Sequence, residues 1–215
     1  MRDPTANASA RTLRGVYRRL FRAFGPQHWW PGDTPLEIAV GAILTQNTAW
    51  TNVEKAISVL KSRRLLSLGR LAPLSPAELA PLIRSAGFHN IKAARLAAFL
   101  KWLKTRGGFA ALTRTPTPDL RPQLLACHGI GPETADSILL YALGRPAFVI
   151  DAYTRRIMSR YGLIAGDEPY EYLRLMFESS LPQRPKLYNE YHALLVRLAK
   201  QNCRSRSVCV SCPLA

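Results

Sequence analysis

The feature that most constrains this chain is a two-glycine turn between two helix-forming segments. Gly129 and Gly131 can adopt backbone angles denied to other residues, and they carry no side chain that would keep a partner away from their amides. Pro132 suits the first position of a helix, and the apolar spacing after it predicts a buried face. The turn therefore presents a helix amino end that could bind an anion, although an ordinary packing hairpin carries the same Gly-x-Gly pattern.

An apolar run over residues 147–150 ends in Asp151. Tyr153, Ile157 and Met158 follow with helical spacing, so the sequence predicts that Asp151 is the N-cap of a helix. A carboxylate that accepts hydrogen bonds from helix amides stays ionised. Capping alone would explain Asp151, but the same group is suited to stabilising positive charge or orienting a water molecule.

Composition and charge point to a globular protein with a polyanionic partner. The chain has 215 residues, 47% of them hydrophobic, which is enough for one large domain or two small ones. Its net charge is +16, from 30 basic and 14 acidic residues, and most of the basic residues are arginine. Nucleic acid is the simplest partner, although a GC-rich genome also favours arginine. No segment is apolar enough for a membrane span or a signal peptide, so we expect a soluble cytoplasmic protein.

Helical periodicity dominates and strand patterns are few, so the sequence predicts an all-α fold. Residues 34–37 (Thr-Pro-Leu-Glu) have the form of a capping box and open a helix that is apolar on nearly every side through Leu44, which we expect to be the buried centre. Residues 1–10 are expected to be a flexible leader. Other helices are expected at about 11–24, 50–62, 75–86, 91–105, 119–126, 133–143, 152–161, 169–178 and 186–202.

Together, the Gly129-Ile130-Gly131 turn, Asp151, the Leu-Thr-Gln-Asn-Thr run over 44–48 and three cysteines near the C-terminus resemble the helix-hairpin-helix, Gly/Pro-rich, Asp superfamily of DNA glycosylases. The endonuclease III branch fits best, over roughly residues 13–212. The resemblance implies two all-α domains. A six-helix bundle with the helix-hairpin-helix would span 34–146, and a domain with an iron–sulfur cluster loop would combine 11–33 with 147–215.

The resemblance also implies roles for individual residues. Such enzymes flip a damaged base out of the duplex and break its glycosidic bond, and Asp151 matches the carboxylate that stabilises the resulting charge on the sugar. Gln46 matches the amide side chain that fills the gap left by the flipped nucleotide; on residue type alone it would be a solvated amide at a helix end. The residues implied in DNA binding are Gln46, Asn47, Gly129, Ile130, Gly131 and Thr134.

Two departures from endonuclease III bear on the reaction. Members that also cleave the strand carry a lysine nucleophile at the position of Glu133, which is either a catalytic-site residue or only a first-turn acid. Adenine-excising members carry a glutamate at the position of Gly41. The chain is more similar to endonuclease III-type 3-methyladenine glycosylases, which implies a base pocket lined by Trp29, Trp30 and Trp50.

Cys203, Cys209 and Cys212 have metal-ligand spacing, and the resemblance implies a [4Fe–4S] cluster. The family spacing is Cys-x6-Cys-x2-Cys-x5-Cys, whereas here the first interval is one residue shorter and the fourth cysteine is missing. The alternatives are a cluster with another or no fourth ligand, a zinc site completed by a residue such as His192, or a decayed site.

The resulting hypothesis is a monofunctional base-excision repair glycosylase that hydrolyses the glycosidic bond of a damaged base, such as an alkylated purine. Its partner would be double-stranded DNA with a damaged base, and we expect a nucleoid-associated monomer. One alternative is a bifunctional glycosylase and abasic-site lyase acting on oxidised pyrimidines. Another is a non-catalytic module that binds DNA structure, which would have no need of the Asp151 carboxylate.

Overall fold

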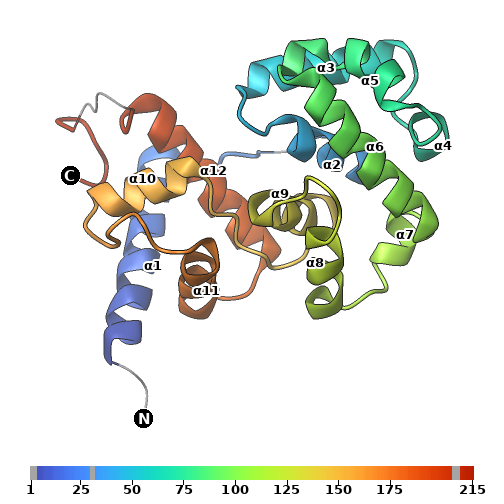
Figure 1. The fold of residues 1–215 in the computed structure, drawn as a ribbon. Coiled ribbons are helices and arrows are strands. Elements are labelled where there is room, and N and C mark those ends of the chain that lie inside the picture. The colour runs from blue at the N-terminus through green and yellow to red at the C-terminus, as the bar shows by residue number, and fades with distance from the viewer. Residues whose placement is uncertain (1–3, 30–31, 205–208) are drawn as a thin grey trace. The chain divides into compact units, whose positions relative to one another are not determined.

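The computed structural model describes residues 4–29, 32–204 and 209–215, and every regular element within these ranges is helical (Figure 1). The all-α prediction is therefore confirmed. The chain divides into two compact units, a continuous one (Trp30–Leu143) and a terminal one that combines Met1–Trp29 with Gly144–Ala215. No helix in the described ranges is long and apolar enough to cross a membrane.

The continuous unit is built around α2 (Pro35–Leu44), in which nearly every side chain is buried. This helix packs against neighbours on several sides, as expected for a segment without a polar face. The expected capping box forms only in part. Thr34 accepts a hydrogen bond from the Glu37 amide, but the Glu37 carboxylate pairs with Lys61 at 2.7 Å. The neighbours of α2 in this unit are α3 (Trp50–Ser62), α6 (His89–Thr105), α9 (Pro132–Ser137) and the π-helical turn η2 (Ile138–Ala142).

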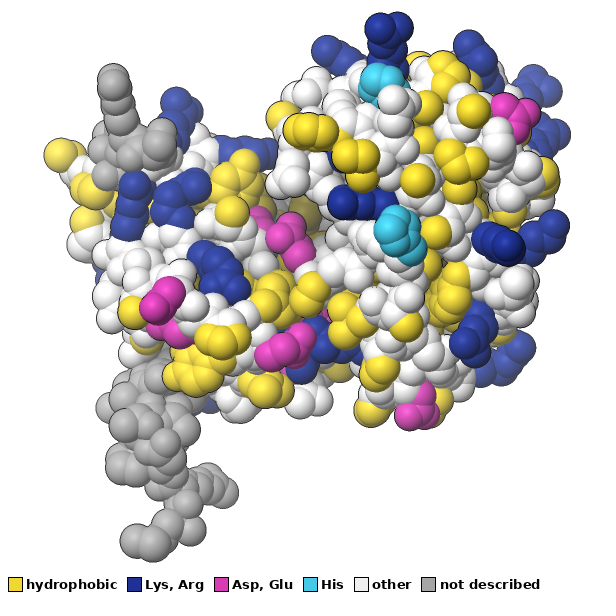
Figure 2. Space-filling model, viewed as in Figure 1, with side chains coloured by type: hydrophobic (Ala, Val, Ile, Leu, Met, Phe, Trp, Pro, Cys, Tyr) yellow, Lys and Arg dark blue, Asp and Glu magenta, His cyan; other side chains and the backbone are white. Residues whose placement is uncertain are grey.

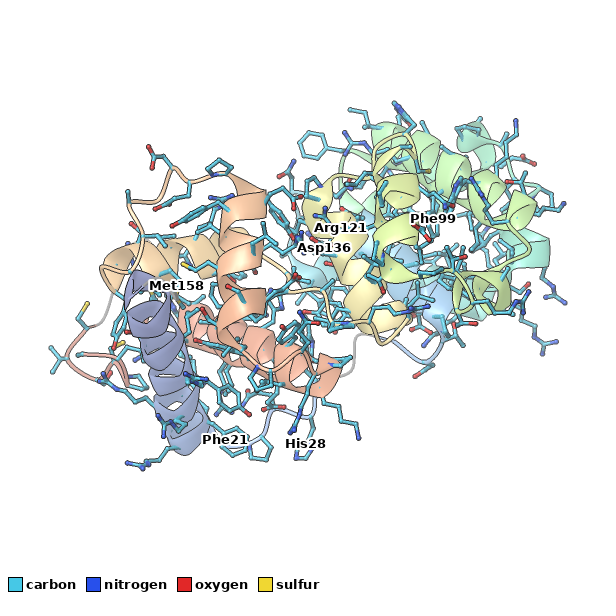
Figure 3. The ribbon with its side chains drawn as sticks, turned by 90° about the horizontal axis from the view of Figure 1, so that it is seen from below. Phe21, His28, Phe99, Arg121, Asp136 and Met158 are labelled. Atoms are coloured by element: carbon cyan, nitrogen blue, oxygen red, sulfur yellow. The ribbon has the colours of Figure 1, made fainter. Side chains whose placement is uncertain are left out.

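The two-glycine turn joins α8 (Thr117–Leu125) to α9, as the sequence predicts. An ion pair holds these helices together: Arg121 Nε lies 2.7 Å from Asp136 Oδ1, and Arg121 Nη2 lies 3.0 Å from Oδ2 (Figure 3). Asp136 is fully buried. Two parallel charge-assisted hydrogen bonds fix both the distance and the orientation between the two side chains. This pair therefore holds α8 and α9 in place on either side of the turn.

Four short elements complete the continuous unit. Two of them, α4 and α7, are single helical turns that the sequence analysis did not predict, and the helix expected at 75–86 is split in two. Their bounds are α4 (Leu68–Leu71), α5 (Pro76–Leu82), η1 (Arg84–Ala86) and α7 (Phe109–Leu112). A complete capping box forms at Ser75 and Glu78, before α5.

The terminal unit consists of α1 (Pro4–Phe24), α10 (Ala152–Arg160), α11 (Tyr170–Ser180) and α12 (Pro185–Gln201). Its core is a cluster of aromatic rings in which Phe148 stacks on Phe177 at 4.1 Å and meets Tyr188 and Tyr191 edge-on. The Tyr191 hydroxyl donates to the Leu13 carbonyl at 2.9 Å, which ties α12 to α1.

The expectation of a flexible leader over 1–10 is wrong for residues 4–10, which form the first turns of α1. Pro4 suits the first position of a helix, and the alanines that follow favour continued helix over a break before Arg11. The helix predicted at 11–24 therefore begins at Pro4, before the amphipathic segment from which it was predicted.

Candidate functional site

Asp151 is the N-cap of α10. Its backbone is extended (φ −94°, ψ 177°), and its Oδ1 accepts a hydrogen bond from the Thr154 amide at 2.7 Å. The buried run before it fixes this position, because residues 147–150 are all almost inaccessible to solvent. The sequence-predicted cap is therefore present, and one carboxylate oxygen is used to form it.

The second oxygen of Asp151 faces His192 on α12. His192 Nε2 lies 3.4 Å from Asp151 Oδ2, and the imidazole is only 5% exposed. Burial alone would raise the pKa of Asp151. The attraction of His192 and the hydrogen bonds from His192 and Thr154 outweigh it, so the pKa of Asp151 lies below its ordinary value. Asp151 is thus an ionised carboxylate at neutral pH.

Trp29 lies against the other side of this pair. Its ring centroid is 5.6 Å from that of His192, with the two planes 32° apart, and the indole is half-buried. Trp29, His192 and Asp151 thus form a continuous line of contacts within the terminal unit. His192, considered above as a zinc ligand, contacts the carboxylate instead. Trp30 lies outside the described residues.

Gln46 follows α2 in the continuous unit, where its side chain is held on three sides. Its Nε2 donates to the Gly129 carbonyl and to Thr134 Oγ1, both at 3.0 Å, and its Oε1 accepts from Arg95 Nη1 at 2.5 Å. Gln46 is therefore not the solvated amide that its residue type suggests. It connects the end of α2 to the two-glycine turn, and Arg95 on α6 completes the network.

The two positions of the turn differ in whether the structure requires glycine there. Gly129 has φ +80°, and a Cβ added there would lie 2.1 Å from Arg95 Cγ. Gly131 has φ −86°, which any residue adopts, and no atom lies within 4 Å of an added Cβ. Both glycines can adopt unusual backbone angles, but only Gly129 does so here. Gly129 is required by the backbone and by the arginine that crosses it.

The remaining residues implied in DNA binding lie around this turn. Asn47 is exposed with a left-handed backbone (φ +53°), next to Gln46. Thr134 is buried and accepts the Gln46 hydrogen bond. Ile130 is 4% exposed, and its amide donates to the Cys127 carbonyl at 3.0 Å. Glu133 is exposed in the first turn of α9.

Trp50, the third tryptophan assigned to the base pocket, begins α3 in the continuous unit and is half-buried. Its ring lies over Gly41: an added Cβ at Gly41 would be 3.2 Å from Trp50 Cη2. Any larger side chain at position 41 would displace the indole. The space that a glutamate would need is therefore occupied by Trp50.

Lys92 was missed by the sequence analysis. It lies on α6, is 1% exposed, and donates from Nζ to the carbonyls of Leu44 at 2.8 Å and Ala86 at 2.7 Å. Burial, with a smaller contribution from Arg95, lowers the pKa of Lys92. Lys92 and Arg95 together support the segment that carries Gln46. No local pattern marks them, because the partners that define this role, Leu44 and Gln46, lie 48 and 49 positions away.

The three C-terminal cysteines are not gathered around a common point. Cys203 is buried, with Arg160 Nη1 3.4 Å from its Sγ, whereas Cys209 is exposed and Cys212 is half-buried. In the described ranges, which include all three, no group of three or more His, Cys, Asp or Glu side chains is placed to hold a metal ion. This arrangement does not fit a cluster, and the [4Fe–4S] assignment stays a prediction.

Basic side chains are spread widely over the surface. Figure 2 shows many Lys and Arg side chains and few acidic ones on the face turned to the viewer. This distribution agrees with the net charge of +16 and with a polyanionic partner.

Comparisons with known proteins identify the family of this chain. A family model described as HhH-GPD superfamily base excision DNA repair protein matches residues 40–183. A protein of Methanocaldococcus jannaschii, provisionally named as a DNA repair glycosylase, is 46% identical over 93% of this chain and 92% of its own length. Endonuclease III of Thermotoga maritima is 26% identical over 93% of this chain and 89% of its own length.

Two solved structures share the fold. The crystal structure of H. pylori 3-methyladenine DNA glycosylase bound to 1,N6-ethenoadenine is 28% identical, with a TM-score of 0.74, covering 91% of this chain and 97% of that one. An endonuclease III–DNA complex has a TM-score of 0.78 at 21% identity, covering 95% of this chain and 92% of that one.

Proposed function

Because this chain belongs to the HhH-GPD superfamily of base excision DNA repair proteins, we propose that it is a DNA glycosylase that excises a damaged base by hydrolysis. The observation that carries the proposal is the Asp151 carboxylate, which accepts a hydrogen bond from the Thr154 amide, faces His192 and is held ionised. A binding module would have no need of such a group.

The reaction needs a negative charge next to the sugar. Breaking the glycosidic bond leaves positive charge on the ring, and a fixed carboxylate in a water-poor site stabilises that charge. Asp151 is suited to this task because its oxygens are oriented by partners on two helices, α10 and α12. The base leaves with the electron pair of the glycosidic bond, and a water molecule then adds to the cationic sugar and gives up a proton.

We propose that strand cleavage does not follow excision. Glu133 occupies the position at which bifunctional members carry the lysine that attacks the sugar, and a carboxylate cannot form a Schiff base. Lys92 is no substitute, because it is buried and its Nζ is bound to two carbonyls.

An alkylated purine is the substrate class we propose. A methylated adenine is positively charged and stacks well on an electron-rich indole, and its glycosidic bond is already weak. Trp29 supports this assignment because it is half-buried and separated from Asp151 only by His192. The H. pylori relative, whose structure contains an ethenoadenine base, is consistent with the same class.

A panel of duplexes, each with a single defined lesion, tests the proposal. We expect release of 3-methyladenine without strand cleavage, and no protein–DNA adduct after borohydride treatment. Asp151→Asn should abolish excision while preserving DNA binding, since asparagine caps a helix about as well as aspartate. Efficient trapping, or release of thymine glycol alone, would favour the bifunctional alternative; a panel without any base release would favour the binding module.

The aromatic contribution has its own matched control. Trp29→Ala should reduce excision roughly ten- to a hundredfold, since stacking is worth about 1–3 kcal/mol per base. Trp102→Ala, which removes a half-buried indole from α6 beside Phe99, should leave excision within a few-fold of the wild type. Equal losses in the two variants would reject Trp29 as a pocket residue.

The resemblance implies a [4Fe–4S] cluster on Cys203, Cys209 and Cys212, which the arrangement of these described residues does not fit. Iron analysis of anaerobically purified protein tests it directly. Absence of iron would reject the cluster, and stoichiometric zinc would replace it with a zinc site. The excision chemistry above does not depend on either result.

A further inference from the structure

His192 is a buried ionisable side chain that contacts the proposed catalytic carboxylate Asp151. It lies on α12, far along the chain from both of its neighbours, and it is 5% exposed. One side of its ring meets the Trp29 indole, and its Nε2 faces Asp151 Oδ2 at 3.4 Å.

Without His192, the carboxylate of Asp151 would be held from one side only. Thr154 holds the carboxylate from the α10 side, through its amide at 2.7 Å from Oδ1 and through its side chain. The contact of His192 with Oδ2 holds the carboxylate from a second helix, α12. Imidazole is suited to the place because its ring nitrogen can donate to an anion while its apolar face packs against an indole.

We propose that His192 is a positioning residue that orients the Asp151 carboxylate for excision, with Trp29 holding the imidazole in place. This inference rests on the proposed glycosylase function. His192 acts through Asp151, and it need not touch the DNA.

Two substitutions separate positioning from packing. His192→Phe keeps an aromatic ring against Trp29 but removes the ring N–H. His192→Gln removes the ring but places an amide N–H at a similar distance along the side chain. Positioning predicts that His192→Phe lowers the single-turnover excision rate by up to about a hundredfold, and that His192→Gln restores most of that loss. A packing role predicts the reverse order.

Affinity for lesion-containing DNA should be similar in both variants, because the proposed role affects the reacting carboxylate and not the binding surface. Activity retained in His192→Phe and lost in His192→Gln would overturn the proposal. So would a loss of excision in His192→Phe that is fully explained by a weaker Kd for the duplex.

A measurement without substrate keeps the inference separate from the proposed function. In protein with 15N-labelled histidine, Asp151→Asn should shift the ring nitrogen resonances of His192, while those of His28, His89 and His128 stay in place. Unchanged His192 resonances would overturn the proposal even if both variants fail to excise. If the wild type excises nothing but the His192 resonances shift, the coupling stands and the glycosylase assignment fails.

Discussion

Gly129 and Gly131 are alike in the sequence, but the structure requires only the first of them. Gly129→Ala should destabilise the protein by about 2–4 kcal/mol, from a left-handed alanine and from the overlap with Arg95. It should also weaken DNA binding, since Arg95 holds Gln46. Urea unfolding and a binding titration measure both effects.

Gly131→Ala is the matched control, because its backbone is ordinary and the space around it is open. We expect its stability to stay within about 0.5 kcal/mol of the wild type. Weaker DNA binding in this variant without loss of stability would indicate close approach of a phosphate at Gly131. Equal destabilisation by the two alanines would contradict the assigned backbone.

The lowered pKa of Asp151 has a consequence for stability in acid. The pKa of the Asp151 carboxylate is lower in the folded protein than in the unfolded chain, where it is about 3.9. Such a group stabilises the folded protein at pH values above the unfolded pKa, and this contribution is lost as the pH falls through the folded pKa. The wild type should therefore exceed Asp151→Asn in stability by more at pH 5 than at pH 3. An advantage that grows on acidification would mean that the folded pKa is raised.

Residues with local roles could be predicted from the sequence, and residues with distant partners could not. Asp151 was identified as an N-cap because the cap is defined by the residues directly after it. The partners of Gln46 lie 83 and 88 positions away at Gly129 and Thr134, so residue type alone suggested a solvated amide. His192 was noticed only as a zinc ligand, because nothing local pairs it with Asp151.

At the scale of elements, the buried Lys92 of α6 binds carbonyls at the ends of α2 and η1. Lys92→Met should destabilise the protein by roughly 1–3 kcal/mol for each carbonyl it leaves without a partner, those of Leu44 and Ala86. Lys101→Met on the same helix is the control, since Lys101 is exposed and its substitution should be nearly neutral. Thermal unfolding of the two variants measures the difference.

A result in which both lysine variants unfold at the wild-type temperature would show that water replaces Lys92. Loss of DNA binding in Lys92→Met, without much loss of stability, would instead assign the lysine to the placement of Gln46.

Helices with strong local signals were predicted well, and those shaped by packing were not. The helix over 50–62 matches α3, because apolar spacing and flanking breaks agree there. The expected second helix of the hairpin instead changes at Ile138 into a π-helical turn. Its hydrogen bonds span one residue more than those of an α-helix, a difference that periodicity cannot resolve over five residues. The short α4 and α7 have too few residues to show a period.

At the scale of the whole molecule, the net charge of +16 should dominate nonspecific DNA binding. If six to ten phosphates are contacted, affinity should fall by about 10³–10⁵ between 50 and 200 mM salt. A titration of undamaged duplex over this range measures the slope. A flat response would mean that the basic surface reflects composition alone and that the duplex is held by other contacts.

The terminal unit is made of two separate stretches of the chain, so its parts cannot all fold at the same time during synthesis. The continuous unit (Trp30–Leu143) can fold as soon as it leaves the ribosome, since α2 and its neighbours all lie within it. Helix α1 must wait for α11 and α12, against which it packs, and Asp151 must wait for His192. A nascent chain can therefore form its two-glycine turn several seconds before Asp151 meets His192, so the carboxylate that the proposed excision requires is the last part to be completed.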